Sequence, residues 1–187
     1  MTDVDDVRYR IAEPSDALGI GQLHADSWQR HYRGAYSDSF LDGDVVADRE
    51  TAWTQRMTAP ASNARTLVAE ADGGVIGFAH LFLGEDATFG SLLENLHVRS
   101  ALKRHGVGTQ LMLRAASIAA EQEPTRGMYL WVLEQNVDAQ AFYRRIGGEI
   151  VERGLAPAPS GDPTRLNGAP YRLRVSWPDP RLLGRES

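Results

Sequence analysis

The chain has 187 residues, a formal net charge of −5 and no cysteine. Its length suits one domain with a sizeable core, so we expect a single domain over 1–187, with the core at about 7–177 and a tail at 178–187. The lack of cysteine excludes disulfides, thiolate metal sites and a cysteine nucleophile, and the negative charge argues against nucleic acid or an anionic membrane as the main partner.

The start of the chain is acidic and lacks the apolar segment of a signal peptide. No apolar run approaches the ~18 residues that a membrane-spanning helix needs. A chain without cysteine also suits a reducing compartment. We therefore expect a cytoplasmic protein with no nucleic acid and no membrane among its partners. The oligomeric state stays open, with a homodimer as one alternative.

The N-terminal third reads as a strand and two helices. Alternation over Val7–Ala12 predicts a half-buried strand, and Pro14 precedes a helix from about 16 to 31. The later part of this helix is rich in aromatic and imidazole side chains. A second helix is expected from Asp38 to about Met57.

The middle of the chain predicts an antiparallel meander of three strands. These strands are expected at 66–71, 75–83 and 88–98, with turns at 72–74 and 84–86. The first turn contains Asp-Gly between alternating apolar runs, which is a strong hairpin signal.

A strand, a basic glycine turn and an amphipathic helix follow one another over 92–120. The first N–H groups of a helix have no intrahelical partner, and the helix dipole places partial positive charge there. The glycines at 106 and 108 allow a phosphate to approach the backbone closely. This stretch therefore predicts a site for a phosphate-bearing cofactor.

The C-terminal part continues with alternating strands and a helix. The apolar strand expected at 128–133 runs parallel to the strand at 92–98, because a strand–helix–strand unit connects them. Asn136 is a good N-cap for a helix at 137–146. Strands are expected at 149–153 and 171–177, joined by a long ordered loop.

The order of these elements resembles the Gcn5-related N-acetyltransferase (GNAT) superfamily over roughly residues 7–177. The family signature Arg/Gln-x-x-Gly-x-Gly/Ala stands here as Lys103-Arg104-His105-Gly106-Val107-Gly108, with lysine at the first position. A second signature is the helix with Asn136, Ala139, Phe142, Tyr143 and Gly147. Each signature lies at the strand–helix junction where the family has it.

The resemblance implies an α/β fold with a mixed, mostly antiparallel sheet of about seven strands, flanked by about four helices. Strands four and five are parallel and splay apart, commonly from a bulge in strand four. The pantetheine arm of acetyl-CoA lies between them, and the turn amides hold its pyrophosphate. The implied cofactor contacts are Leu96, Val98, Lys103, Arg104, His105, Gly106, Val107, Gly108, Thr109 and Asn136. No metal is implied.

Acetyl transfer to an amine needs a base, because an alkylamine with a pKa of about 10 is mostly protonated at neutral pH. Glu94 is the candidate general base, directly or through a water, and an exposed strand residue is the alternative interpretation. Strict alternation places Glu94 on a core-facing side with Leu96, so either a bulge re-aims it or it lies in a cleft. His97 is the alternative base, because an imidazole suits proton transfer near neutral pH.

The remaining site residues lie on helices. Tyr143 would lie near the thioester sulfur as a proton donor that helps the reaction without being indispensable, since a thiolate leaves easily. Trp28, His31 and Tyr32 are expected to line the acceptor site, with ordinary helix packing as the alternative. His24 and His31 lack a carboxylate at ligand spacing, so we expect no metal site there.

Arg172 and Arg174 share one face of the last strand. They are either contacts for an acidic acceptor or part of a solvated face, and the solvated face is the favoured interpretation.

The sequence thus predicts an N-acetyltransferase that moves the acetyl group of acetyl-CoA to a primary amine of a small molecule, by direct attack through a tetrahedral intermediate. One alternative is an acetyltransferase for a protein or peptide amine. The other is a non-catalytic acyl-CoA-binding module, against which the presence of Tyr143 and Glu94 argues.

Overall fold

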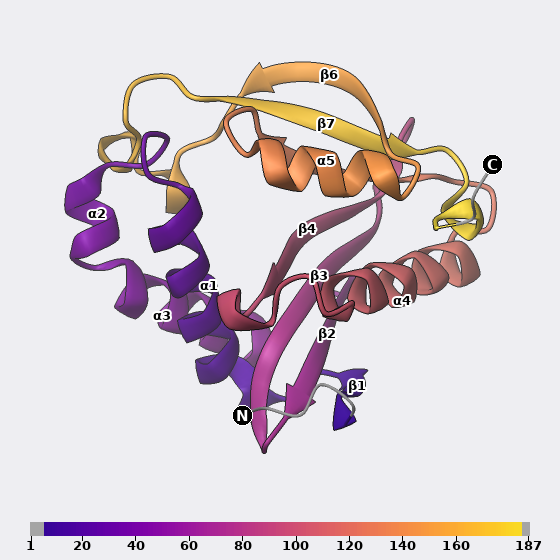
Figure 1. The fold of residues 1–187 in the computed structure, drawn as a ribbon, viewed down its shortest axis with the longest axis horizontal. Helices are drawn as coiled ribbons and strands as arrows, with labels where there is room; N and C mark the ends of the chain where they lie inside the picture. Colours follow the sequence, from indigo (N-terminus) through magenta and orange to yellow (C-terminus); the bar gives the residue numbers. More distant parts are fainter. Residues whose placement is uncertain (1–5, 185–187) are drawn as a thin grey trace.

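The computed structural model describes residues 6–184 of the chain, which form one seven-stranded sheet with helices on both faces (Figure 1). The strand order is β1-β2-β3-β4-β5-β7-β6. Every neighbouring pair is antiparallel except β4 and β5, which are parallel. The expected mixed sheet with parallel strands four and five is therefore confirmed.

The N-terminal third contains one helix more than expected. Gly43 separates two helices where one was expected from 38 to 57, because the chain turns away at this residue with φ −107° and ψ −102°. A Cβ at Gly43 would lie 2.7 Å from the Ser39 carbonyl oxygen, so another residue would not fit this break. The elements are β1 (Arg8–Ile11), η2 (Pro14–Asp16), α1 (Ala17–His31), α2 (Asp38–Asp42) and α3 (Val45–Thr58).

The meander of β2 (Ala64–Ala71), β3 (Gly74–Asp86) and β4 (Gly90–Val98) is confirmed, with one shifted turn. Asp72 and Gly73 form the expected tight turn and both have positive φ. The second turn was expected at 84–86, but β3 continues to Asp86. The Asp86 carboxylate accepts the N–H groups of Thr88 and Phe89, so the turn forms after it.

The strand–helix–strand unit and the helix after it follow the sequence prediction. Asn136 caps its helix as expected, since its Oδ1 accepts the N–H of Ala139 at 3.2 Å. The elements are η3 (Ser100–Leu102), α4 (Val107–Gln122), β5 (Met128–Leu133) and α5 (Val137–Arg145).

The last third contains β6 (Glu149–Leu155) and β7 (Tyr171–Trp177), joined by a long segment with two short helices, η4 (Pro159–Gly161) and η5 (Pro163–Arg165). The expected tail is packed over part of its length: after η6 (Pro180–Leu182), Leu183 is buried in the core beside α4. The rest of the expected tail, 185–187, lies outside the described residues, as do 1–5.

The two faces of the sheet carry different helices (Figure 1). The main core packs one face of the sheet against α4 and α5, through residues such as Ile76, Leu111 and Tyr143. The other face of β2 and β3 packs against α1 and α3 through Ile20, Trp53 and Phe78. None of the helices in residues 6–184 is long and apolar enough to cross a membrane.

Candidate active site

The parallel strands β4 and β5 separate soon after they meet. Their register contains only Ser91 opposite Met128 and Leu92 opposite Tyr129. Beyond Leu92, β4 pairs with β3 alone, so its other edge presents main-chain donors and acceptors without a strand partner. Because buried main-chain groups need partners, this splay fits an extended ligand that has amide groups, such as a pantetheine arm.

A bulge in β4 lies at Glu94. His80 pairs with Asn95 and Leu81 pairs with Leu93, so Glu94 is an extra residue in β4. The bulge changes which side chains share a face. Glu94 contacts Arg56 of α3 and His97 contacts Ser27 of α1, whereas Leu96 packs against the core that contains α4. Of the two sequence alternatives for Glu94, re-aiming by a bulge is the one observed.

Glu94 is held by an ion pair. Its Oε2 accepts a hydrogen bond from Arg56 Nη1 at 2.5 Å, and both side chains are about one-third exposed. The Arg56 guanidinium lies 5.1 Å from the ring centre of Trp53, which limits where it can move. The carboxylate is therefore fixed in position and still reachable from solvent.

His97 lies half-buried between α1 and the sheet. Its Nδ1 lies 2.7 Å from Ser27 Oγ, and its ring stacks 4.7 Å from His24 and 5.3 Å from Phe78. Burial, together with the nearby His31 and Lys103, lowers the pKa of His97 to about 3. His97 is therefore neutral at neutral pH and a weak base.

The phosphate turn is 103–108, and two of its residues have left-handed backbone. Arg104 has φ +67° and Gly106, the N-cap of α4, has φ +83°. Gly106 has no side chain to bond the first N–H groups of α4, so these donors remain open. Val107 is buried, while Gly108 and Thr109 are half-buried. This geometry fits an anion such as a pyrophosphate.

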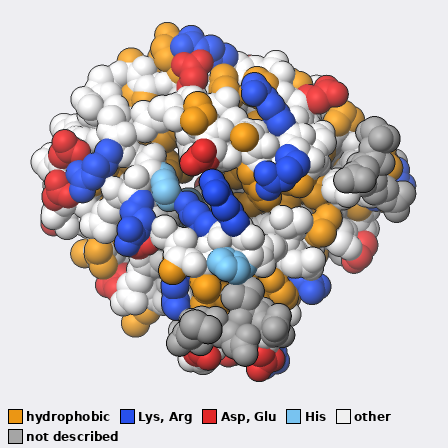
Figure 2. Space-filling model, in the orientation of Figure 1, with side chains coloured by type: hydrophobic (Ala, Val, Ile, Leu, Met, Phe, Trp, Pro, Cys, Tyr) orange, Lys and Arg blue, Asp and Glu red, His pale blue; other side chains and the backbone are white. Residues whose placement is uncertain are grey.

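The basic side chains of the phosphate turn differ in their contacts. Lys103 Nζ lies 2.6 Å from Nε2 of His31, at the end of α1. His105 Nδ1 contacts the Lys103 carbonyl oxygen at 2.9 Å. Arg104 is exposed. Lysine and arginine side chains gather beside histidines between α1 and the start of α4 (Figure 2). Burial lowers the pKa of both Lys103 and His31, and the charge on Lys103 also contributes to the lowered pKa of His31.

Tyr143 lies on α5, inside the core, with its ring 6.0 Å from that of Trp177. Burial raises its pKa, and the phenol of Tyr32 raises it further. The hydroxyl is therefore protonated over the whole neutral range and suits a donor. Tyr32 is the C-cap residue of α1, so the structure brings the predicted proton donor near a predicted acceptor-site residue. The Asn136 amide oxygen is occupied as the cap of α5.

An aromatic cluster lies around the end of α1 and consists of Trp28, Tyr32, Tyr36 and Phe40. Tyr36 packs 5.0 Å from Trp28 and 4.9 Å from Tyr32. Burial raises the pKa of Tyr32 to about 12. Tyr36 was not among the sequence candidates; it lies beyond the end of α1, so no helical spacing links it to Trp28 or Tyr32.

The long segment 156–170 covers part of the aromatic cluster. The Ser37 N–H donates to the Arg165 carbonyl at 2.8 Å, and the Asn167 N–H donates to the Ala35 carbonyl at 2.9 Å. Asp48 joins α3 to the same segment, since it pairs with both Arg49 and Arg165. The Arg49 guanidinium lies 4.4 Å over Trp28. No local sequence pattern links this segment to the helices it contacts.

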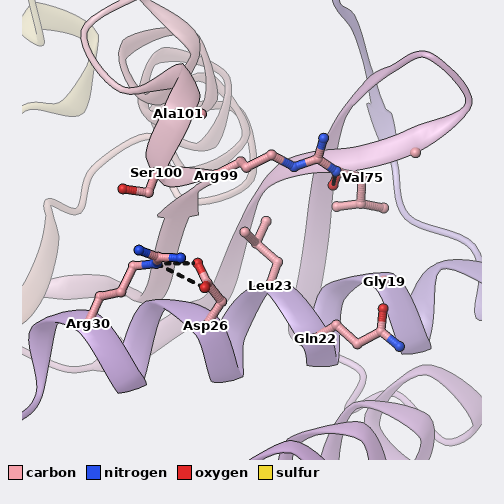
Figure 3. Close-up of a pocket in the computed structure, with 10 residues that line it drawn as sticks. Gly19, Gln22, Leu23, Asp26, Arg30, Val75, Arg99, Ser100 and Ala101 are labelled. Atoms are coloured by element: carbon pink, nitrogen blue, oxygen red, sulfur yellow. Dashed lines mark hydrogen bonds and ion pairs between the residues drawn. The ribbon is translucent and has the colours of Figure 1, made fainter. Parts of the chain in front are cut away.

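A pocket of about 500 Å³ lies on the other side of α1, beside the loops at Gly74 and Ser100 (Figure 3). Its charged groups are already satisfied. Asp26 pairs with Arg30 at 2.9 Å, and Arg99 donates to the Val75 carbonyl at 3.1 Å. The pocket includes neither Glu94 nor Tyr143, so we assign it no part in the chemistry.

The candidate metal ligands do not assemble. Within residues 6–184 no group of three histidine, aspartate or glutamate side chains could hold a metal ion. His24, one of the paired histidines of α1, instead accepts a hydrogen bond from Trp53 Nε1 at 2.9 Å.

Comparisons with known proteins agree with this geometry. The model of the acetyltransferase (GNAT) family matches residues 25–148. The chain is 27% identical over 145 residues to the probable N-acetyltransferase Rv2775 of Mycobacterium tuberculosis, covering 74% of this chain and 78% of that protein. It is 32% identical over 127 residues to the mycothiol acetyltransferase of Actinosynnema mirum, covering 64% of this chain but only 41% of that enzyme.

Solved structures show the same fold. The PaiA N-acetyltransferase of Thermoplasma acidophilum, determined with coenzyme A, superposes with a TM-score of 0.70 at 18% identity over 92% of this chain and 99% of that one. Nourseothricin acetyltransferase superposes with a TM-score of 0.63 at 24% identity over 92% of this chain and 98% of that one. The chain belongs to the GNAT acetyltransferase family and is an acyl-CoA-dependent acetyltransferase.

Proposed function

We propose that this chain transfers the acetyl group of acetyl-CoA to a primary amine of a small molecule. The observation that carries the proposal is that a cofactor-binding backbone and a candidate general base both lie on or next to β4 at the β4–β5 splay. An open backbone edge and the phosphate turn lie along β4, and the fixed carboxylate of Glu94 projects from the bulge of the same strand. The similarity to a mycothiol acetyltransferase, whose name refers to mycothiol and not to a protein, supports a small molecule as acceptor.

The cofactor side would work through main-chain groups. Acetyl-CoA supplies a thioester carbonyl, and the open N–H groups at the start of α4 would hold its pyrophosphate. The main chain at Leu96 and Val98 would bind the pantetheine amides in place of a β5 partner. The remaining contacts predicted from the sequence at the phosphate turn and Asn136 belong to this proposal.

The acceptor amine would lose its proton to Glu94, directly or through a water. Glu94 supports this role better than His97, because burial holds the pKa of His97 at about 3 and Ser27 occupies its Nδ1. The attack on the carbonyl would be direct. Tyr143, protonated at neutral pH, would donate a hydrogen bond to the leaving thiolate. Trp28, His31 and Tyr32 would line the acceptor side.

A protein or peptide amine is the second candidate acceptor. The segment 156–170 favours the small molecule, because it lies against Ala35 and Ser37 at the aromatic cluster and limits the room for an extended chain. A cytoplasmic location and the absence of nucleic-acid and membrane partners remain predictions from the sequence, as does a homodimer as one alternative for the oligomeric state.

The test is a comparison of acceptors at equal amine concentration. Thiol release from acetyl-CoA would be measured with small primary amines and with peptides that have a free N-terminus or a lysine. We expect turnover with small amines. Acetylation of peptides alone would overturn the proposed acceptor class while leaving the enzyme class in place.

A further inference from the structure

Arg172 is half-buried, and it forms no ion pair with any of the residues 6–184. It lies on β7, and its guanidinium stacks 4.0 Å over the ring of Trp131. Its Nε is buried and has no hydrogen-bond partner among residues 6–184. Burial lowers its pKa, and the neighbouring Arg174 lowers it further. The prediction that Arg172 lies on a solvated face is therefore wrong, because a half-buried guanidinium stacked on an indole ring has lost much of its hydration.

Its neighbour Arg174 is neutralised. Arg174 pairs with Asp86 at 3.3 Å and with Glu152 at 2.9 Å. Glu152 is also the carboxylate that raises the pKa of Arg172, but it is not close enough to Arg172 for an ion pair within the described residues. Of the two arginines, only Arg172 offers an uncompensated positive charge.

Arg172 faces the acceptor side of the sheet. It lies opposite Leu133 of β5, which packs into the cluster that contains Trp28 and Tyr36. Burial raises the pKa of the Tyr36 phenol, and the charge on Arg172 opposes that rise, in keeping with this shared side. Tyr36 packs on Tyr32 within the aromatic cluster. Arg172 therefore lies on the side of β7 that faces the aromatic cluster.

The strand on the other side of Arg172 places a glycine beside it. Gly154 of β6 is its register partner, and the Trp131 ring takes the space over Gly154, where a Cβ would meet it at 3.8 Å. The guanidinium face lies on Trp131 and its Nε is buried, so the Nη groups are the donors left for a ligand. The planar edge of a guanidinium, with its single positive charge, is complementary to a carboxylate, which it binds through two parallel hydrogen bonds.

We propose that Arg172 binds a carboxylate of the acceptor, so the acceptor is an amine that also carries a carboxylate. This inference rests on the proposed function and narrows its substrate class. The amine would reach the splay near Glu94 and Tyr143, and the carboxylate would be held on the far side of the aromatic cluster. Arg172 would set which amines are accepted and would take no part in the chemical step.

The experiment uses acceptors in matched pairs. Each ω-amino acid from β-alanine to 6-aminohexanoate, and each of several α-amino acids, would be compared with its own carboxamide by thiol release from acetyl-CoA. We expect the acid of the best length to exceed its amide roughly 10- to 100-fold in kcat/KM, the range for a hydrogen-bonded charged group. Arg172→Gln should remove that preference and leave the rate with the amide within about threefold of wild type, since only charged-group recognition is lost.

Two further variants keep the inference testable. Arg153→Gln is the matched control, because Arg153 also stacks on an aromatic ring, Tyr171, but is exposed and paired with Glu134. It should keep the preference. Gly154→Asp keeps Arg172 and places a carboxylate opposite it, so it should lower the rate with the acids more than with the amides even if Arg172→Gln does not fold.

The outcomes separate the two claims. Equal use of acids and amides by the wild-type chain, or an unchanged preference in Arg172→Gln, would overturn the role of Arg172 and leave the proposed function standing. No acetylation of any amine by the wild-type chain would overturn the proposed function and this inference together.

Discussion

The two sides of the β4–β5 splay are built in different ways. The cofactor side is one continuous stretch, β4, the phosphate turn and α4, and it acts mainly through main-chain groups. The acceptor side is assembled from α1, α3, the β4 bulge and the segment 156–170, and it acts through side chains. A site made of backbone depends on local conformation, whereas a site made of side chains depends on how distant segments pack.

The largest effect is expected from a side chain at Gly106. Its φ of +83° strains any β-branched residue, and a displaced backbone would no longer aim the first N–H groups of α4 at a phosphate. Gly106→Val should weaken CoA binding by at least ~100-fold, measured by calorimetric titration, because the anion site itself is lost.

Gly108→Val and Lys103→Ala are compared with Gly106→Val in the same titration with CoA. A Cβ at Gly108 would lie 3.6 Å from the Val98 side chain, so a larger residue must occupy space along β4. Lys103 contacts His31, and its removal should weaken CoA binding only a few-fold, as for a single exposed charge. Equal losses in the three variants would mean that the phosphate contact lies elsewhere.

On the acceptor side the largest expected effect is that of Glu94→Gln. Loss of a general base lowers the rate roughly 100-fold or more. The affinity for CoA should not change, because Glu94 acts on the amine and does not bind the cofactor. The measurement is kcat/KM for the amine as a function of pH. His97→Gln is the control. A rate limb near pH 6.5 that disappears in His97→Gln and persists in Glu94→Gln would transfer the role of base to His97.

Much of the cofactor side could be predicted from the sequence. The hairpin at Asp72, the parallel pair of strands and the cap at Asn136 each follow from a few adjacent residues. The break at Gly43 was missed although Gly43 stands between two aspartates, which are poor helix formers, because the apolar residues Phe40, Leu41, Val45 and Trp53 were assigned to one helix. The partner of Glu94 was missed as well. Arg56 is 38 residues away, and no local pattern connects the two.

Three histidines of the acceptor side make the stability of the fold depend on pH. On the acceptor side His24 and His80 are buried and His97 is half-buried, and burial lowers the pKa of each, to about 3 for His80 and His97. The unfolded chain, with an imidazole pKa near 6.5, binds more protons than the folded chain between about pH 6.5 and 3, so stability falls as the pH falls through this window.

This pH dependence can be measured by urea denaturation. For His80 alone the loss of unfolding free energy between pH 7 and pH 5 is about 2 kcal/mol by proton linkage. His80→Gln should reduce the loss of unfolding free energy between pH 7 and pH 5 by about that amount. Identical slopes in His80→Gln and the wild-type chain would show that His80 is not neutral and enclosed.

The smallest catalytic effect is expected at Tyr143. Since a thiolate leaves without full protonation, Tyr143→Phe should slow turnover roughly tenfold and keep the KM for acetyl-CoA. Single-turnover rates with saturating acetyl-CoA measure this directly. Complete loss of acetylation with intact acetyl-CoA affinity would contradict a merely assisting role.

The most direct test of the central claim is thiol release from acetyl-CoA by the purified full chain with a mixed panel of small primary amines. We expect release that depends on the amine and is accompanied by an N-acetylated product of matching mass. Tight binding of CoA with no turnover on any amine in the panel would contradict the claim and would identify the chain as a binding module.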